Sequence, residues 1–145
     1  MPVEIVIYYT SHPYPTKMAS RIVLASPPTT APDCRQCGGP SFLLKTRSSN
    51  RNGNAGRPYY KCLLCNKFLV FNDVRGNNVR NPPCHFGASS KMQISGAHKN
   101  VPRGLHFVCR LGKCDFYQAV TDDNQRQISL REDSLVNLFK STLVI

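Results

Sequence analysis

Four cysteines in two C-x-x-C pairs are the residues of this chain best suited to chemistry. Cys34 and Cys37 form the first pair, and Cys62 and Cys65 form the second after 24 intervening residues. A C-x-x-C turn brings two thiolates to one metal ion. Two such turns complete the tetrahedral shell that structural Zn²⁺ prefers, with Zn–S distances of about 2.3 Å. The spacing therefore predicts a structural Zn²⁺ site built from these four cysteines.

A C-x-x-C pair can instead carry out thiol–disulfide exchange, where it normally opens a helix in a thioredoxin-like βαβ unit. Here Gly38 and Gly39 follow the first pair, and a strand-like segment follows the second. Glycine permits the tight turn of a metal-binding knuckle, so we favour zinc over redox chemistry.

A disulfide framework would suit a secreted protein. The N-terminal segment, however, lacks the basic start and the longer apolar run of a signal peptide. No segment approaches the roughly 20 apolar residues of a membrane helix. We therefore expect an intracellular location, the nucleus included, no secretion and no membrane partner.

The remaining cysteines predict a second and weaker metal site, made of Cys84, Cys109 and Cys114. Three sulfurs need a fourth ligand, and we predict His85 for this position. Adjacent side chains of an extended chain point to opposite sides, so a tight turn is needed for His85 to join its neighbour. His98 or His106 as the ligand, and a site that stays incomplete, are the open alternatives.

The two cysteine groups lie in segments of similar layout, residues 33–75 and 84–122. The interval from Cys37 to Cys62 is 25 positions, as is that from Cys84 to Cys109. A self-similar layout of this kind predicts two copies of one small unit. Residues 76–83, rich in Asn and Pro, are predicted to link them.

Short segments next to the later cysteines mix aromatic and β-branched residues, as strands do: RPYYKC, KFLVF, GLHFVC and FYQAV. Units of about 40 residues bury too little apolar surface to fold without a metal or disulfides. The predicted fold class is therefore small, metal-stabilised β: two tandem zinc ribbons, each a short antiparallel sheet. Residues 1–32 are predicted to be an extension, with one strand at Ile5–Tyr9 and a Pro-rich tether. Residues 123–145 are predicted to be a tail containing a short helix that covers a sheet face.

The formal net charge of +11 is concentrated on the cysteine-bearing segments. Residues 33–82 hold nine Lys/Arg and two Asp, or +7, and residues 83–122 hold five Lys/Arg and two Asp, or +3. A Zn²⁺ ion with four thiolates subtracts two of these charges. A basic surface of this size favours a polyanionic partner. Solvated side chains that serve only solubility are the alternative.

The stretches NGNAGRPYYKC and CNKFLVFND resemble the GRF-type zinc finger and, within it, the fungal GRF-like zinc-ribbon proteins. The residues that carry the resemblance are Gly56, Arg57, Tyr59, Tyr60, Cys62, Phe68, Phe71 and Asp73. The second segment fits more loosely, and we read it as a degenerate copy. The first segment opens with C-x-x-C where the family usually has C-x-C. In the second, Phe86 stands where the family has a ligand.

In better-known relatives, GRF fingers are appended to DNA-processing enzymes, where they help to hold single-stranded nucleic acid. The resemblance thus implies that this chain binds single-stranded DNA or RNA. Grooves for single strands combine cations with exposed aromatic rings. The residues predicted to serve here are Arg57, Tyr59, Tyr60, Arg47, Arg51 and Lys61. Since successive strand residues face opposite sides, one of the two tyrosines is expected in the core.

The sequence therefore predicts a zinc-binding, non-catalytic module for nucleic acid. No H-E-x-x-H motif, phosphate-binding loop or carboxylate pair beside a ligand is found, so we expect no enzyme. A zinc-ribbon module that binds another protein is the alternative. Its binding would be insensitive to salt.

Overall fold

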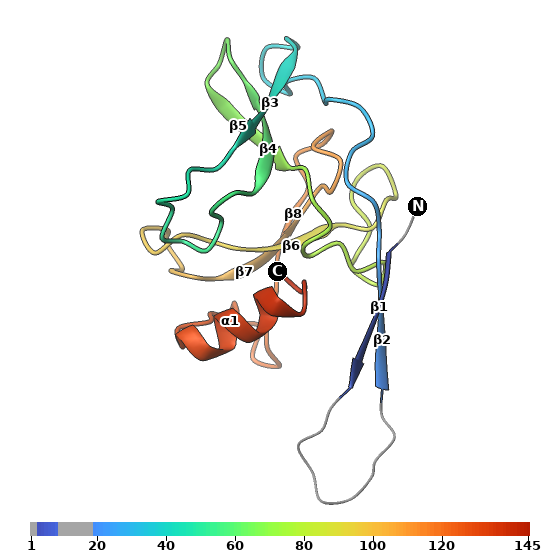
Figure 1. The fold of residues 1–145 in the computed structure, drawn as a ribbon, viewed down its shortest axis with the longest axis vertical. Helices are drawn as coiled ribbons and strands as arrows, with labels where there is room; N and C mark the ends of the chain where they lie inside the picture. Colours follow the sequence, from blue (N-terminus) through green and yellow to red (C-terminus); the bar gives the residue numbers. More distant parts are fainter. Residues whose placement is uncertain (1–2, 9–18) are drawn as a thin grey trace, which may run out of the picture.

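The computed structural model describes residues 3–8 and 19–145, which form three small antiparallel sheets and one short helix (Figure 1). The two larger sheets each contain three strands in sequential order. The predicted architecture of two short sheets with a C-terminal helix is confirmed. Within the described residues, no helix has both the length and the apolar character needed to cross a membrane.

The first three-stranded sheet consists of β3 (Ser41–Lys45), β4 (Pro58–Cys62) and β5 (Lys67–Phe71). Tyr60 lies opposite Val70, whereas Lys61 lies opposite Phe68, so the register shifts by one residue. The shift is a β-bulge at Leu69 on β5. As a result, Leu69 and Val70 are both buried, and the phenylalanines on either side of them share the outer face.

The second three-stranded sheet consists of β6 (Lys91–Ile94), β7 (Leu105–Val108) and β8 (Tyr117–Ala119). Leu105 and Phe107 alternate with more exposed neighbours, as expected for a strand with one face against a core. Strands β4, β5, β7 and β8 fall within segments predicted to be strands. Strands β3 and β6 lie in stretches for which no strand is predicted from the sequence.

The C-terminal helix α1 (Asp133–Ser141) lies within the predicted tail, residues 123–145, and covers one face of the second sheet (Figure 1). Val136 is its buried residue, packed in a cluster with Leu105, Leu130 and Ile145. Leu138 of the same helix is 55% exposed. The predicted role of the helix, to cover a sheet face, is confirmed.

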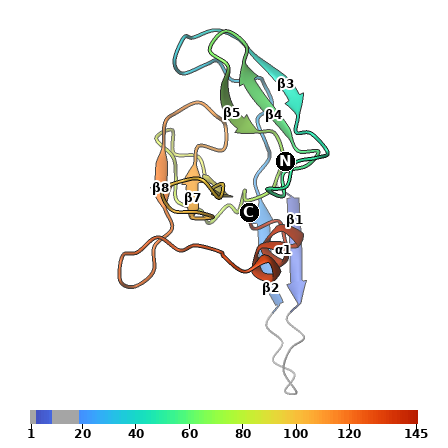
Figure 2. The ribbon, with the colours of Figure 1, turned by 90° about the vertical axis from the view of Figure 1, so that its left-hand side faces the viewer.

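The N-terminal segment forms a hairpin of β1 (Val3–Tyr8) and β2 (Ala19–Leu24), which extends away from the two ribbons (Figure 2). The prediction of one strand followed by a tether was therefore incomplete. Position 9, the end of the predicted strand, lies outside the described residues. Leu24 is fully buried and bridges to Asn78, so the hairpin is anchored to the segment between the ribbons.

That connecting segment, predicted as a linker, is packed between the two units. Asn77 is fully buried, and its side-chain amide donates to the carbonyl oxygens of Ala25 and Asp73, each at 3.0 Å. Gly76 has φ +76°, and a Cβ there would lie 2.1 Å from the carbonyl oxygen of Met92. Only glycine fits this close crossing. The connection therefore fixes one ribbon against the other.

Candidate metal centres and binding face

The first cysteine group has the geometry of a four-thiolate metal site. One Sγ atom from each of Cys34, Cys37, Cys62 and Cys65 lies within 4.8 Å of the other three. The Sγ atoms of Cys37 and Cys62 are 3.5 Å apart. In a tetrahedron with Zn–S distances of about 2.3 Å, the sulfurs are about 3.8 Å apart, so these residues fit Zn²⁺.

Backbone N–H groups around this group stabilise negative sulfur. Gln36 N–H donates to Cys34 Sγ at 3.4 Å, and Gly39 N–H donates to Cys37 Sγ at 3.3 Å. The N–H groups of Cys37 and Gln36 lower the pKa of the Cys34 thiol to about 6. A hydrogen bond to Cys37 and burial raise the pKa of the Cys65 thiol to about 12. Zn²⁺ therefore has to displace the proton of the Cys65 thiol when it binds.

The second group contains three cysteines: the sulfur atoms of Cys84, Cys109 and Cys114 lie within 4.8 Å of one another. Burial opposes ionisation of Cys109. Backbone N–H groups of Lys113, Cys114 and Leu111 outweigh burial and lower the pKa of that thiol. The three residues come from the turn before β6 and from the turn between β7 and β8. This set can also hold zinc.

None of the predicted histidines belongs to this group. His85 is 61% exposed, and its Nε2 lies 3.2 Å from Asp115 Oδ1. Its ring meets Phe116 edge-on, with 5.6 Å between the ring centroids. His106 stacks on Tyr117, and burial lowers the pKa of its imidazole. Assigning His85 as the fourth ligand is therefore corrected: the second group comprises three thiolates among the described residues.

The outer face of the first sheet carries an aromatic cluster of Tyr59, Phe68 and Phe71. The Tyr59 centroid lies 5.6 Å from that of Phe68 and 6.4 Å from that of Phe71. The two phenylalanine centroids are 4.9 Å apart. A shallow hollow of about 590 Å³ lies over this cluster and is also lined by Leu44, Lys45, Arg47, Asn54 and Lys61. The face thus combines ring surfaces with three cations.

The predicted binding residues divide between this face and the interior. Tyr59, Arg47 and Lys61 line the hollow. Tyr60 is 9% exposed and belongs to the core around the cysteines, as expected for one of two successive tyrosines. Arg51 lies away from the cluster, at a separate pocket beside α1. The alternation of strand residues determines this division.

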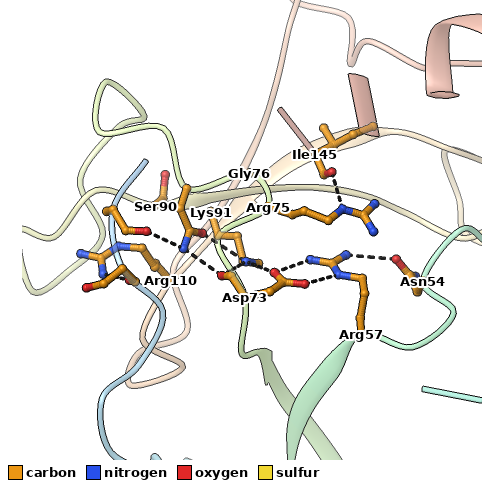
Figure 3. A network of polar contacts seen from close by, with 12 residues as sticks. Asn54, Arg57, Asp73, Arg75, Gly76, Ser90, Lys91, Arg110 and Ile145 are labelled. Atoms are coloured by element: carbon orange, nitrogen blue, oxygen red, sulfur yellow. Dashed lines mark hydrogen bonds and ion pairs between the residues drawn. The ribbon is translucent and has the colours of Figure 1, made fainter. Parts of the chain in front are cut away.

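Arg57 was predicted to contact nucleic acid, but the structure buries it to 7% exposure. Its Nε donates to Asp73 Oδ2 at 2.6 Å, and its Nη2 donates to Oδ1 at 2.9 Å (Figure 3). Its Cζ lies 3.7 Å from the centroid of Phe71, a cation–π contact. Arg57 therefore supports the aromatic cluster from beneath, and its guanidinium is not free to pair with a phosphate.

Asp73 also accepts a 2.8 Å hydrogen bond from Lys91 Nζ, on the second sheet (Figure 3). Lys91 has no exposed side-chain surface and donates to Asn77 Oδ1 at 3.1 Å as well. One carboxylate thus joins a cation from each ribbon. Burial favours the neutral form of Asp73, but Arg57 and Lys91 lower the pKa of its carboxyl to about 2.

Sequence reasoning missed Leu44 as a contributor to the hollow and did not place Phe68 and Phe71 on its floor. The two phenylalanines are three positions apart, which in a regular strand puts them on opposite faces. Only the bulge at Leu69 brings them together. The cross-strand pair of Leu44 and Tyr59 depends on β3, which the sequence did not reveal.

Residues 31–75 match the family model described as GRF-like zinc ribbon domain. The match spans the first cysteine group, the aromatic cluster and Asp73, so this part of the chain is a zinc ribbon domain. It does not extend to the second sheet. No curated protein and no solved structure matches the chain.

Proposed function

We propose that this protein is a non-catalytic, zinc-dependent module that binds single-stranded DNA or RNA on the outer face of its first sheet. The observation that carries the proposal is the aromatic cluster of Tyr59, Phe68 and Phe71 with cations around it. Nucleobases stack on exposed aromatic rings, and lysines and arginines neutralise the phosphates between them. A duplex hides the flat faces of its bases, so such a surface favours single strands.

Zinc in the four-cysteine site would support this face by fixing the strands that form it. Cys62 ends β4, and Cys65 belongs to the turn that leads into β5. Binding of one metal to both residues sets the register of the two strands that carry the rings. Loss of zinc is therefore expected to abolish binding through loss of the fold.

The test is a fluorescence anisotropy titration of a short labelled single strand with wild type, Tyr59→Ala and Tyr117→Ala. Tyr117 is an exposed tyrosine of the second sheet, 60% accessible, and serves as the matched control. Stacking of one base is worth roughly 1–3 kcal/mol, so Tyr59→Ala should weaken binding by about tenfold. Tyr117→Ala should leave affinity unchanged. Equal affinities of the three proteins would contradict the assignment of this face.

The same titration at several salt concentrations tests the role of the cations. For single strands, log affinity falls with log salt by about 0.7 for each neutralised phosphate. Removing the charge of Lys61 should reduce the magnitude of this slope by about 0.7, the value for one neutralised phosphate. A slope that Lys61→Ala does not change would argue against phosphate contact at this face.

Binding to another protein is the second candidate, favoured by two exposed leucines in the turn between β4 and β5. Leu63 is 55% exposed and Leu64 is 78% exposed, beside the first metal site. Exposed apolar side chains of this size are typical of contact surfaces when they cluster. Undetectable binding of any oligonucleotide at low salt would favour this candidate over the first.

A further inference from the structure

The turn that opens the first ribbon shows how two ligands are presented from one loop. Cys34 N–H donates to the Gly39 carbonyl oxygen, and Gly38 N–H donates to the Cys34 carbonyl oxygen, both at 2.8 Å. Gly38 has φ +71°, a left-handed conformation that glycine adopts without strain. Cys37, directly before this glycine, supplies the second sulfur of the pair.

The turn that opens the second ribbon closes with the same hydrogen bonds and one residue fewer. Cys84 N–H donates to the Ala88 carbonyl oxygen at 2.8 Å, and Gly87 N–H donates to the Cys84 carbonyl oxygen at 2.9 Å. Gly87 also has a left-handed φ, +77°. The residue directly before it is Phe86, which therefore occupies the place of Cys37. Its side chain is 66% exposed and has no atom that could bind a metal.

The remaining three ligands of the second group are in place. Cys84 and Cys109 are buried, and Cys114 is half-buried, with the sulfurs within 4.8 Å of one another. The backbone N–H groups of Phe116 and His85 face the Cys114 sulfur. The backbone of His85 thus supports a thiolate while its imidazole turns toward Asp115.

We propose that the second group binds Zn²⁺ through these three thiolates and leaves the fourth coordination position to an exogenous thiolate. A zinc ion with three protein ligands and one open position exchanges its fourth ligand, unlike a closed structural site. Thiolate is a soft donor that matches the other three. On binding, the thiol would release its proton to solvent, and its sulfur would take the coordination position that the three cysteines leave open.

Space and charge beside the group suit a small thiol. A hollow of about 260 Å³ is bordered by Cys109 and Cys114 and by Arg35, Phe116 and Tyr117. Arg35 reaches across from the first ribbon, and its Nη1 donates to the Gly112 carbonyl oxygen at 3.2 Å. Zinc with four thiolates carries a net charge of −2, and a guanidinium nearby stabilises it.

The test replaces zinc with Co²⁺ in the full chain, since the d–d absorption of tetrahedral Co²⁺ reports its ligand set. The reductant is a phosphine, and 2-mercaptoethanol is the added probe. Native mass spectrometry should show two metal ions per chain. In wild type, the thiol should shift the bands of one of the two ions in a saturable manner. The ion in the four-cysteine site should not respond.

Phe86→Cys is the matched variant, because it restores a fourth sulfur at an exposed position where folding is not at risk. Its spectrum without added thiol should already resemble that of a four-thiolate site, and 2-mercaptoethanol should not change it. His85→Ala should keep both metal ions and the wild-type response. Loss of one metal in His85→Ala would overturn the proposal, as would a wild-type spectrum that the thiol does not shift.

The thiolate could come from a small molecule or from a cysteine of a second copy of this chain. Native mass spectrometry before thiol addition distinguishes the two sources. A monomer that gains one thiol supports a small-molecule ligand. A dimer that the thiol dissociates identifies the second copy as the source. A dimer that persists in excess thiol, with unshifted bands, contradicts exchange at this position.

Discussion

Replacing Asp73 by asparagine tests the contact that joins the two ribbons. The carboxylate accepts hydrogen bonds from Arg57 and from Lys91, whose side chains are 8% and 0% exposed. Asparagine keeps the shape but removes the charge. Both cations then remain buried without a counter-charge, which costs about 3–5 kcal/mol when a buried pair is broken.

The lowered pKa of Asp73 gives the stability contribution of this contact by a second route. It falls from 3.8 to about 2 because the effects of Arg57 and Lys91 exceed that of burial. At about 1.4 kcal/mol per pH unit, this shift corresponds to roughly 2 kcal/mol of stability. Because the folded pKa is lowered, that stability is present above the ordinary pKa of 3.8 and is lost as pH falls toward 2. The two routes together bracket a loss of roughly 2–5 kcal/mol at neutral pH.

The assay is urea unfolding followed by far-UV circular dichroism at pH 7, with free zinc held constant by a metal buffer, because metal binding contributes to stability. With a urea slope of about 2 kcal/mol per M, Asp73→Asn should lower the midpoint by about 1–2.5 M. Asp122→Asn is the matched control. Asp122 follows Cys114 by eight residues, as Asp73 follows Cys65, but it is exposed, and its hydrogen bonds within the described residues come from backbone N–H groups. Midpoints that fall equally in the two variants would refute the argument.

Three further predictions follow from the same contacts. Gly76→Ala should destabilise the fold by several kcal/mol, because the added Cβ would lie 2.1 Å from the Met92 carbonyl oxygen. Gly96→Ala is the control in the same urea assay, because a Cβ there meets nothing within 4 Å. Burial lowers the pKa of Lys91 to about 8, so its side-chain NMR signals should titrate near that value. The unfolded chain binds this proton more tightly than the folded chain does, so the lysine should make the free energy of unfolding rise with pH between about 8 and 10.5. A measured pKa of Lys91 near 10.5 would instead show that its ammonium group is solvated. Cys62→Ser should release one of two zinc ions. Hydrogen exchange should then show that amide protection is lost in β4 and β5 and weakened in β6. Intact protection of β4 would exclude a structural role for the metal.

The sequence predicted the elements that local composition controls and missed those that depend on contacts between distant residues. The C-x-x-C spacing identified the first metal group because the motif itself encodes the turn. Strand β5 was visible as KFLVF, an apolar run after a cysteine turn. Strand β3 was not, because its apolar residues 42–44 are exposed and follow no alternation of buried and exposed positions.

The same limit applies to individual side chains of the binding face. Arg57 precedes an aromatic strand in a basic segment, and nothing local distinguishes it from the arginines that remain exposed. Its burial results from Asp73, 16 residues later, which in turn is fixed by Lys91. His85 directly follows a cysteine, but its ring direction depends on a turn one residue shorter than its counterpart.

The contact between Asp73 and Lys91 changes how the two ribbons should be regarded. Tandem copies of a small zinc unit are expected to fold separately, and loss of one metal would then leave the other unit intact. Here Lys91 of the second sheet is fully buried against a carboxylate of the first ribbon. If the first ribbon unfolds, this lysine loses its counter-charge and the second ribbon opens on that side. We therefore expect metal binding at the four-cysteine site to stabilise β6 across this interface, in addition to the strands of the first ribbon.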